Sequence, residues 1–146
     1  MDVKMVFDHL EGLQLVRACF SRNRFCHLLT SMRFDDKSSR TQRRERDIFA
    51  PITDIWNEFQ TNVQKHYAPC LDITIDEQLV PFRGRCRFLQ YLPSKPDKYG
   101  LKIFWATDPE TNYPIAGIPY LGKAERTRAT NLGYRMVIDL VDRFAG

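Results

Sequence analysis

The chain has 146 residues, of which 43% are hydrophobic, and a formal net charge of +4, so its length suits one ordinary core and leaves little room for two full domains. It contains neither a charged-then-apolar signal segment nor an apolar run of the ~18 residues needed to cross a bilayer, which argues against a membrane partner and predicts an intracellular setting. The basic excess is compatible with a polyanionic partner and equally with an ordinary soluble protein.

The N-terminal part of the chain is predicted to be helical. Residues 1–20 are apolar, although Gly12 weakens the prediction of one continuous helix there. Residues 21–36 begin with Ser21, a good N-cap, and then show the i, i+3, i+4, i+7 spacing of an amphipathic helix. The apolar positions with this spacing are Phe25, Leu28, Leu29 and Met32.

A polar, basic connector separates this region from the next predicted helix. Residues 37–47 hold five basic side chains and show no apolar periodicity, so we expect them at the surface. Residues 50–67 then show one apolar stripe, with Pro51 near the first turn, where proline is tolerated.

Beyond Pro69 the pattern changes from helical to extended. Residues 71–82 alternate and are rich in β-branched side chains, and residues 98–122 are predicted to form a β-hairpin. The turn chemistry of the hairpin is supplied by Asp108, Pro109 and Asn112. Residues 131–146 return to helical spacing. This order is typical of an α+β protein, and three strands with one covering helix would leave an open edge and a half-covered face, so we expect an incomplete sheet.

The cysteines do not form a metal-binding pattern. Cys19, Cys26, Cys70 and Cys86 include no CxxC pair, and none of the three histidines stands near them at metal-ligand spacing. We therefore expect free thiols and no structural zinc.

An acidic pair, Asp76 and Glu77, lies inside the predicted strand at residues 71–82. Because side chains alternate along a strand, Ile73, Ile75 and Glu77 point to one face and Asp76 to the other. If the isoleucines face a core, Asp76 lies at a different surface or cleft; if both faces are covered, it is a buried carboxylate that needs a cation or hydrogen-bond donors. Either arrangement suits Mg²⁺, which binds one or two carboxylates and completes its shell with water and phosphate oxygens.

A basic segment follows at residues 81–102, with six basic side chains against one acidic side chain. Aromatic residues are interleaved with these charges, and such a segment can hold a phosphate backbone. A solvated loop pinned to the core by its aromatic residues explains the same pattern, so both interpretations stay open. In the same way, Arg83 and Arg85 would simply neutralise the acidic pair if Asp76 held no metal.

The stretch TIDEQLVPFRGRCRFLQYLPSKPDKYGLKIFWATDPETNYPIAGIPYLGK, residues 74–123, closely resembles piggyBac-type transposases and the host proteins derived from them. Upstream, SRNRFCHLLTSMRFDDKSSR and DIFAPITDIWNEF resemble the helical region of the same family. The resemblance covers residues 20–146, whereas residues 1–19 depart from it. It implies a helical region at residues 1–68, linked to dimerisation and DNA binding, followed at residues 69–146 by the first part of a catalytic domain of RNase H-like fold.

In that family, three aspartates of the DDE/DDD type hold two divalent metal ions, Mg²⁺ or Mn²⁺, for cut-and-paste DNA transposition. The first aspartate stands in the TIDE motif, which maps it onto Asp76. One ion activates a water or a 3′-hydroxyl and the other stabilises the leaving oxygen. The resemblance also implies a nuclear location, a DNA partner in the form of transposon ends or chromatin, and a homodimer or a transposase partner.

The second and third aspartates of the family have no counterpart in residues 1–146. Asp108 in the predicted turn, and Asp139 and Asp142 in the last predicted helix, are carboxylates at other positions. A lone carboxylate binds Mg²⁺ weakly and cannot place two ions about 4 Å apart. We therefore expect a partial transposase that is inactive as this chain alone or, alternatively, a domesticated module that binds DNA or a transposase without catalysis.

Contacts with DNA phosphates are expected mainly in the basic segment. The candidates there are Arg83, Arg85, Arg87 and Lys95. Weaker candidates in the basic connector are Arg43, Arg44 and Arg46.

Overall fold

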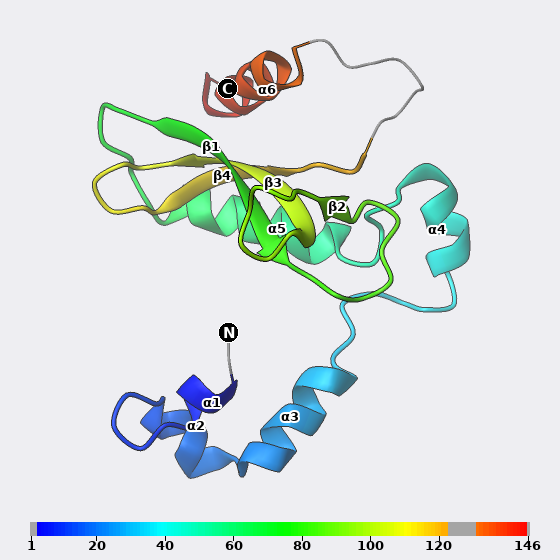
Figure 1. Ribbon diagram of the computed structural model, residues 1–146, viewed down its shortest axis with the longest axis vertical. Helices are drawn as coiled ribbons and strands as arrows, with labels where there is room; N and C mark the ends of the chain where they lie inside the picture. The colour runs from blue at the N-terminus through cyan, green and yellow to red at the C-terminus, as the bar shows by residue number, and fades with distance from the viewer. Residues whose placement is uncertain (1–2, 123–130, 146) are drawn as a thin grey trace. The chain divides into compact units, whose positions relative to one another are not determined.

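The computed structural model describes residues 3–122 and 131–145 (Figure 1). It divides into two compact units, Met1–Asp36 and Lys37–Gly146. Among the described residues, no helix combines the length and the apolar character that a bilayer crossing requires.

The first unit is helical, as predicted. It contains α1 (Val3–Val6), α2 (Gln14–Cys19) and α3 (Arg22–Ser31). Ser21 caps α3, because its hydroxyl accepts a hydrogen bond from the backbone N–H of Arg24 at 3.3 Å. The N-cap predicted from the sequence is therefore confirmed.

A tight turn at Gly12 separates α1 from α2. A Cβ atom at this position would lie 2.3 Å from the carbonyl oxygen of Asp8, so only glycine allows the backbone to come this close. Behind the turn, the rings of Phe7 and Phe20 pack against Phe25 with centroid distances of 5.4 and 6.3 Å. The apolar residues of this segment thus form two short helices instead of one.

The second unit begins with two helices, α4 (Arg40–Arg46) and α5 (Thr53–Lys65). The longer one confirms the predicted helix at residues 50–67, and Pro51 lies just ahead of it. The shorter one was not predicted, because residues 37–47 show no apolar periodicity, and none of its residues is buried, as expected for a surface segment. Arginine, glutamine and glutamate are good helix formers, and Arg43 ties this short helix to the carbonyl of Ala50, so it forms without an apolar stripe.

Four strands form one antiparallel sheet. They are β1 (Thr74–Pro81), β2 (Gln90–Tyr91), β3 (Tyr99–Thr107) and β4 (Pro114–Pro119). The central strand is β3, which pairs with β1 along one edge and with β2 and β4 along the other. The predicted hairpin is confirmed, with Asn112 in the left-handed region of its turn at φ 58°. The two-residue strand β2 was not predicted.

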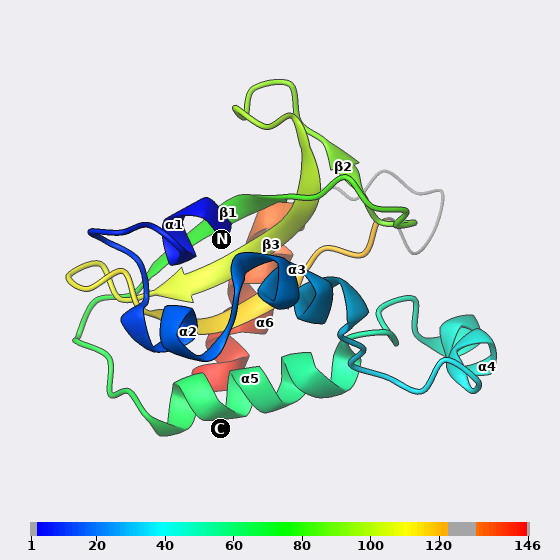
Figure 2. The ribbon, with the colours of Figure 1, turned by 90° about the horizontal axis from the view of Figure 1, so that it is seen from below.

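The sheet lies between two helices, with α5 on one face and α6 (Leu132–Ala145) on the other (Figures 1 and 2). On the α6 face, Leu140 is fully buried against Phe104 and neighbouring alanines. On the α5 face, Trp56 packs against Trp105. The α+β prediction is confirmed. The expectation of a half-covered sheet was wrong, because a helix packs on each face.

The error has a structural cause: α5, assigned from the sequence to a helical region ending at residue 68, packs against β4. Its side chain Gln60 reaches the sheet and accepts a hydrogen bond from the backbone N–H of Gly117 at 2.7 Å. The second compact unit, Lys37–Gly146, therefore includes α5 together with the sheet.

Candidate functional site

Asp76 is exposed on the α5 face of the sheet. It lies directly opposite Trp105 in the antiparallel register, so both side chains point to that face. Ile75 points the other way and packs with the cluster beneath α6. Of the two arrangements that the sequence left open, the structure therefore has the carboxylate at a surface away from the core.

The surface around Asp76 is hollowed. The cavity, called here the Asp76 hollow, is open to solvent and has a volume of about 460 Å³. It is lined by Asp76, Glu77, Gln78, Trp105, Thr107, Asn112 and Pro114. A small polar ligand or a hydrated ion can therefore reach the carboxylate.

The Asp76 carboxylate has few contacts with the protein. One of its oxygens accepts a hydrogen bond from the backbone N–H of Glu77 at 2.7 Å. In the described part of the chain, no lysine or arginine forms an ion pair with it. The sequence left open that Arg83 and Arg85 neutralise the acidic pair. In the described part of the chain, neither arginine pairs with Asp76.

Glu77 has a different environment. Its carboxylate forms an ion pair with Lys102, whose ammonium also lies 4.6 Å from the centre of the Phe104 ring. Lys95 donates a long hydrogen bond, 3.5 Å, to the backbone carbonyl of Glu77. The neighbour of Asp76 is therefore a structural carboxylate, and its cation is a lysine instead of the arginines expected.

Asp108 is also structural. It is only 2% exposed, and its carboxylate accepts hydrogen bonds from the N–H of Cys70 at 3.1 Å, the hydroxyl of Tyr67 at 2.8 Å and the N–H of Glu110 at 2.8 Å. These donors, with Cys70 first, hold the pKa of Asp108 well below its usual value. The ionised side chain joins the segment before β1 to the β3–β4 turn.

The remaining carboxylates do not complete a metal centre. Asp139 and Asp142 are exposed on α6, on the face of the sheet opposite Asp76. Within residues 3–122 and 131–145, no three His, Cys, Asp or Glu side chains are grouped to hold a metal ion. The donors around Asp76 fit one weakly held Mg²⁺, since this ion accepts a single carboxylate and keeps several waters, but they do not fit two ions.

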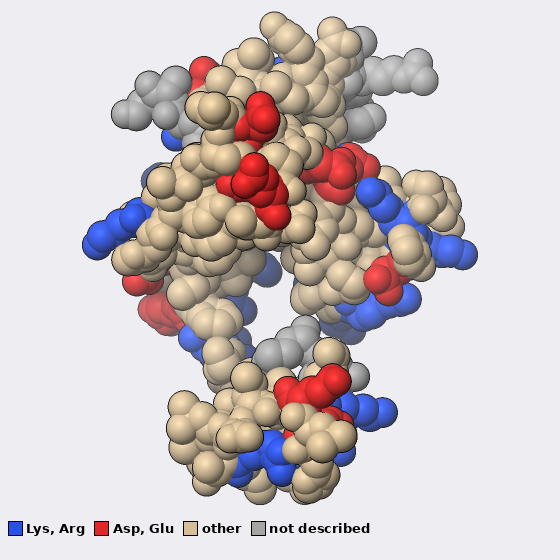
Figure 3. Space-filling model, turned by 90° about the vertical axis from the view of Figure 1, so that its left-hand side faces the viewer, with Lys and Arg blue, Asp and Glu red and all other residues tan. Residues whose placement is uncertain are grey.

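Acidic side chains are nevertheless frequent at the end of the second unit that carries the β3–β4 turn. Figure 3 looks onto the end of the second unit that carries the β3–β4 turn, and acidic patches lie near the centre of this unit, in the upper half of the picture. Lysine and arginine side chains lie mainly towards its margins. A bare polyanion would be repelled from the middle of this face, whereas a cation would be attracted.

The basic segment forms a second hollow, of about 200 Å³, called here the basic hollow. Arg85 and Arg87 from the loop after β1 meet Arg44 from α4 around it. The apolar part of its lining includes Ile48, Pro51, Ile52, Phe82, Phe88 and Leu101. Two basic clusters that are distant in the sequence thus share one site.

The other two predicted DNA contacts lie outside the basic hollow. The guanidinium of Arg83 lies over the ring of Tyr99, 5.6 Å from its centre, and Arg83 remains exposed. Lys95 is partly buried beside Glu77. Asp76 lies five residues before the end of β1 at Pro81, and five extended steps span about 17 Å. The arginine loop is therefore not adjacent to the carboxylate.

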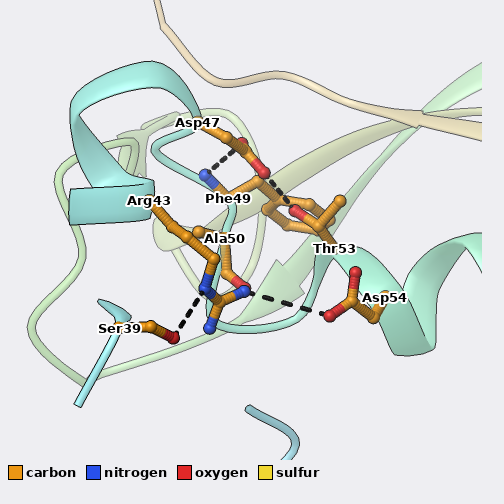
Figure 4. A network of polar contacts seen from close by, with 7 residues as sticks. All are labelled: Ser39, Arg43, Asp47, Phe49, Ala50, Thr53 and Asp54. Carbon is orange, nitrogen blue, oxygen red and sulfur yellow. Dashed lines mark hydrogen bonds and ion pairs between the residues drawn. The ribbon is translucent and has the colours of Figure 1, made fainter. Parts of the chain in front are cut away.

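Arg43, a weaker candidate, is held by the protein itself (Figure 4). Its Nε donates to the hydroxyl of Ser39 at 3.3 Å and its Nη1 donates to the carbonyl of Ala50 at 3.1 Å. Nη1 also lies 3.9 Å from the carboxylate of Asp54. Asp47, beside this network, accepts hydrogen bonds from the backbone N–H of Phe49 and from the hydroxyl of Thr53, the first residue of α5. Arg43 therefore fixes the connection between α4 and α5.

Two features of this region escaped the sequence reasoning. Trp105 was assigned to a strand without a role, and Arg44 was not linked to Arg85 and Arg87. Strand alternation placed Trp105 on one face of β3, but the register that puts it opposite Asp76 had no signal in the sequence.

The chain is similar to known transposases over nearly its whole length. The model of a DDE transposase family described as Transposase IS4 matches residues 2–146. A cryo-EM structure of a piggyBac transposase synaptic complex with hairpin DNA is 42% identical, with a TM-score of 0.78 over 97% of this chain and 30% of that one. An α+β fold with a partial RNase H-like domain is thus confirmed. The family match includes residues 2–19, which corrects the expectation that residues 1–19 depart from the family.

Proposed function

This chain belongs to the piggyBac-type transposase family, and we propose that it supplies the first metal-binding carboxylate, Asp76, of a catalytic domain for cut-and-paste DNA transposition. The observation that carries the proposal is the state of Asp76 itself. In the TIDE motif, this carboxylate is exposed, lines an open hollow and has no counterion among the described residues. A rigid strand holds it in place, as metal chemistry requires.

The metal proposed for this site is Mg²⁺ or Mn²⁺. When bound, such an ion activates a nucleophile or stabilises a leaving oxygen. Asp76 would hold the ion through its carboxylate, one oxygen of which accepts a hydrogen bond from the N–H of Glu77. The nearby Lys95 adds positive charge where a phosphate would approach.

Residues 1–146 alone are proposed to lack cleavage activity. Transfer of a DNA strand through two ions needs further carboxylates around them, and a single aspartate cannot position both. The chain spans 30% of the length of the piggyBac transposase that it matches. Strand cleavage by the purified chain in Mg²⁺ or Mn²⁺, abolished by Asp76→Asn, would refute the proposed inactivity.

Metal binding by Asp76 is testable without activity. Bound Mn²⁺ broadens the NMR signals of nearby amides, so titration should broaden residues 74–78 first in the ¹⁵N spectrum. Asp76→Asn should remove this effect, whereas Glu110→Gln, which changes an exposed carboxylate in the β3–β4 turn, should leave it. Equal broadening in the Asp76→Asn variant would refute the assignment.

DNA is the proposed partner, held through phosphates at the basic segment. Arg85 and Arg87 are exposed at the basic hollow, with Arg44 beside them, and Arg83 and Lys95 extend the positive surface. The target is proposed to be transposon ends or chromatin in the nucleus. The helical residues 1–68 are proposed to contribute to dimerisation, or to contact with a transposase partner, and to DNA binding.

A domesticated DNA-binding module is the second candidate function. It is favoured by one observation: the basic hollow is assembled from α4 and the loop after β1, without any contribution from Asp76. A module of this kind binds DNA equally well in EDTA, and Asp76→Asn does not change its affinity. Mg²⁺-dependent affinity that is lost in the Asp76→Asn variant would favour the catalytic role.

A further inference from the structure

The indole of Trp105 lies beside Asp76, and the function proposed above gives it no role. The two residues are direct partners in the β1–β3 register, so their Cα atoms are about 5 Å apart and their side chains share a face. Both line the Asp76 hollow, where Trp105 is partly exposed. An aromatic surface and a carboxylate therefore meet in one site.

Contacts with four residues fix the orientation of this indole. Its Nε1–H donates to Oε1 of Gln78 at 2.9 Å. The rings of Trp56 and Phe59 in α5 pack against it, with centroid distances of 5.6 and 6.4 Å. Its six-membered ring lies against Gly117, because a Cβ there would be 2.5 Å from Cζ3. The ring is preorganised, so a ligand that packs on it restricts little additional side-chain motion.

We propose that Trp105 is a DNA-binding residue, on which the base of an unpaired nucleotide packs while the adjacent phosphate reaches the metal ion held by Asp76. This inference rests on the proposed function, because it requires both the ion and the DNA. Indole surfaces stack on bases of any sequence. The phosphate and Asp76 are both negative, so they approach each other only with a cation between them.

The neighbouring side chains match a nucleotide. Thr107 and Asn112, which also line the Asp76 hollow, are uncharged hydrogen-bonding groups suited to a base or a sugar. One residue that lines the basic hollow, Leu101, lies on the same face of β3 as Trp105, so the basic hollow reaches this side of the sheet. A DNA strand that follows β1 can therefore contact both hollows.

A cationic protein segment is the competing ligand. An arginine could stack on Trp105 and form an ion pair with Asp76. The two ligands respond to metal in opposite ways, because Mg²⁺ at Asp76 promotes binding of a phosphate and weakens binding of an arginine. Without metal, the acidic side chains on this face favour the arginine. With Mg²⁺ at Asp76 the repulsion of a phosphate is offset, and the basic hollow beyond the other end of β1 offers further phosphate contacts, so we favour DNA.

The test uses the chain labelled with 5-fluorotryptophan, which gives one ¹⁹F signal for each of its two tryptophans. Trp105→Phe assigns the signals. A single-stranded oligonucleotide in Mg²⁺ should shift the Trp105 signal, but not in EDTA or in the Asp76→Asn variant. An oligonucleotide of the same length without bases should give a much smaller shift.

Affinities provide a second readout. Trp105→Ala should weaken oligonucleotide binding in Mg²⁺ about tenfold, and Trp105→Phe less than about threefold, because a phenyl ring still stacks. Tyr134→Ala, which removes an exposed aromatic side chain from α6 on the other face of the sheet, should have no effect. If Trp105→Ala does not fold, the unmodified chain is used instead: the shift of its Trp105 signal by the ordinary oligonucleotide is compared with the shift by the base-free one.

The inference is overturned if a saturating oligonucleotide leaves the Trp105 signal unchanged or if both oligonucleotides shift it equally. If Mn²⁺ still broadens residues 74–78 in that case, only the role of Trp105 fails and the proposed function stands. If Mn²⁺ does not broaden them, the proposed function fails with it. A shift caused by an oligoarginine peptide without metal, and not by DNA, would assign the site to a protein partner and overturn the inference.

Discussion

The proposed DNA contact predicts how salt affects binding when two arginines are removed. Arg85 and Arg87 are exposed at the basic hollow, and among the described residues no hydrogen bond or ion pair ties either guanidinium to the protein. Replacing both by alanine removes two positive charges without removing a structural contact of the kind that Arg43 makes. The change therefore tests phosphate binding separately from folding.

The expected magnitude follows from counterion release. Each phosphate contact contributes about −0.9 to the slope of log affinity against log salt. If Arg83, Arg85 and Arg87 each contact one phosphate, the slope is about −2.7, and raising salt from ~50 to ~200 mM weakens binding about 40-fold. One of these three contacts, that of Arg83, remains in the double variant, so on this count the slope is about −0.9 and the same change in salt weakens binding about 3.5-fold.

Fluorescence anisotropy of a labelled duplex, measured at several salt concentrations, gives both slopes. The control is Arg135→Ala with Arg143→Ala, which removes the same charge from exposed positions of α6. It should keep the slope of the unmodified chain. If the Arg85 and Arg87 double variant keeps that slope as well, the phosphate contacts lie elsewhere and the assignment of the basic hollow is wrong.

Three further predictions concern the scaffold of the site. Leu140→Ala removes a fully buried side chain between α6 and the sheet and should destabilise the second unit by about 2–5 kcal/mol in urea unfolding; a loss below about 1 kcal/mol would show that α6 is not packed there. Asp108→Asn presents an amide donor to the N–H of Cys70, so the variant should be less stable. Because the folded pKa of Asp108 is depressed, this difference is present above the ordinary aspartate pKa of about 3.9 and shrinks as the pH falls below it; a constant difference would contradict the linkage. Burial and the Asp108 carboxylate raise the pKa of the Cys70 thiol. At about pH 8, iodoacetamide should therefore label exposed Cys19 before Cys70, as followed by mass spectrometry. Equal labelling rates would refute this prediction.

The sequence predicted which face of the strand Asp76 lies on, but not which side chains from other strands surround the acidic pair. Alternation along the strand placed Asp76 on the opposite face from Ile75, and the structure has it there, exposed. The partner of Glu77 was not predictable, because Lys102 reaches it across the β1–β3 register. The acidic side chain in the predicted turn, Asp108, did have local signals, since it bonds the N–H groups that follow it.

Local patterns in the sequence by themselves determined most elements of this protein: the cap of α3, the amphipathic α5, the β3–β4 hairpin and the α+β order. These depend on side-chain spacing and turn chemistry within a few residues. Only the tertiary structure decided that α5 covers the sheet, that Trp105 stands opposite Asp76 and that Arg44 meets Arg85. The physical reason is that strand register and helix docking depend on packing between segments far apart in the chain, and a local pattern carries no information about which partner a face will bury against.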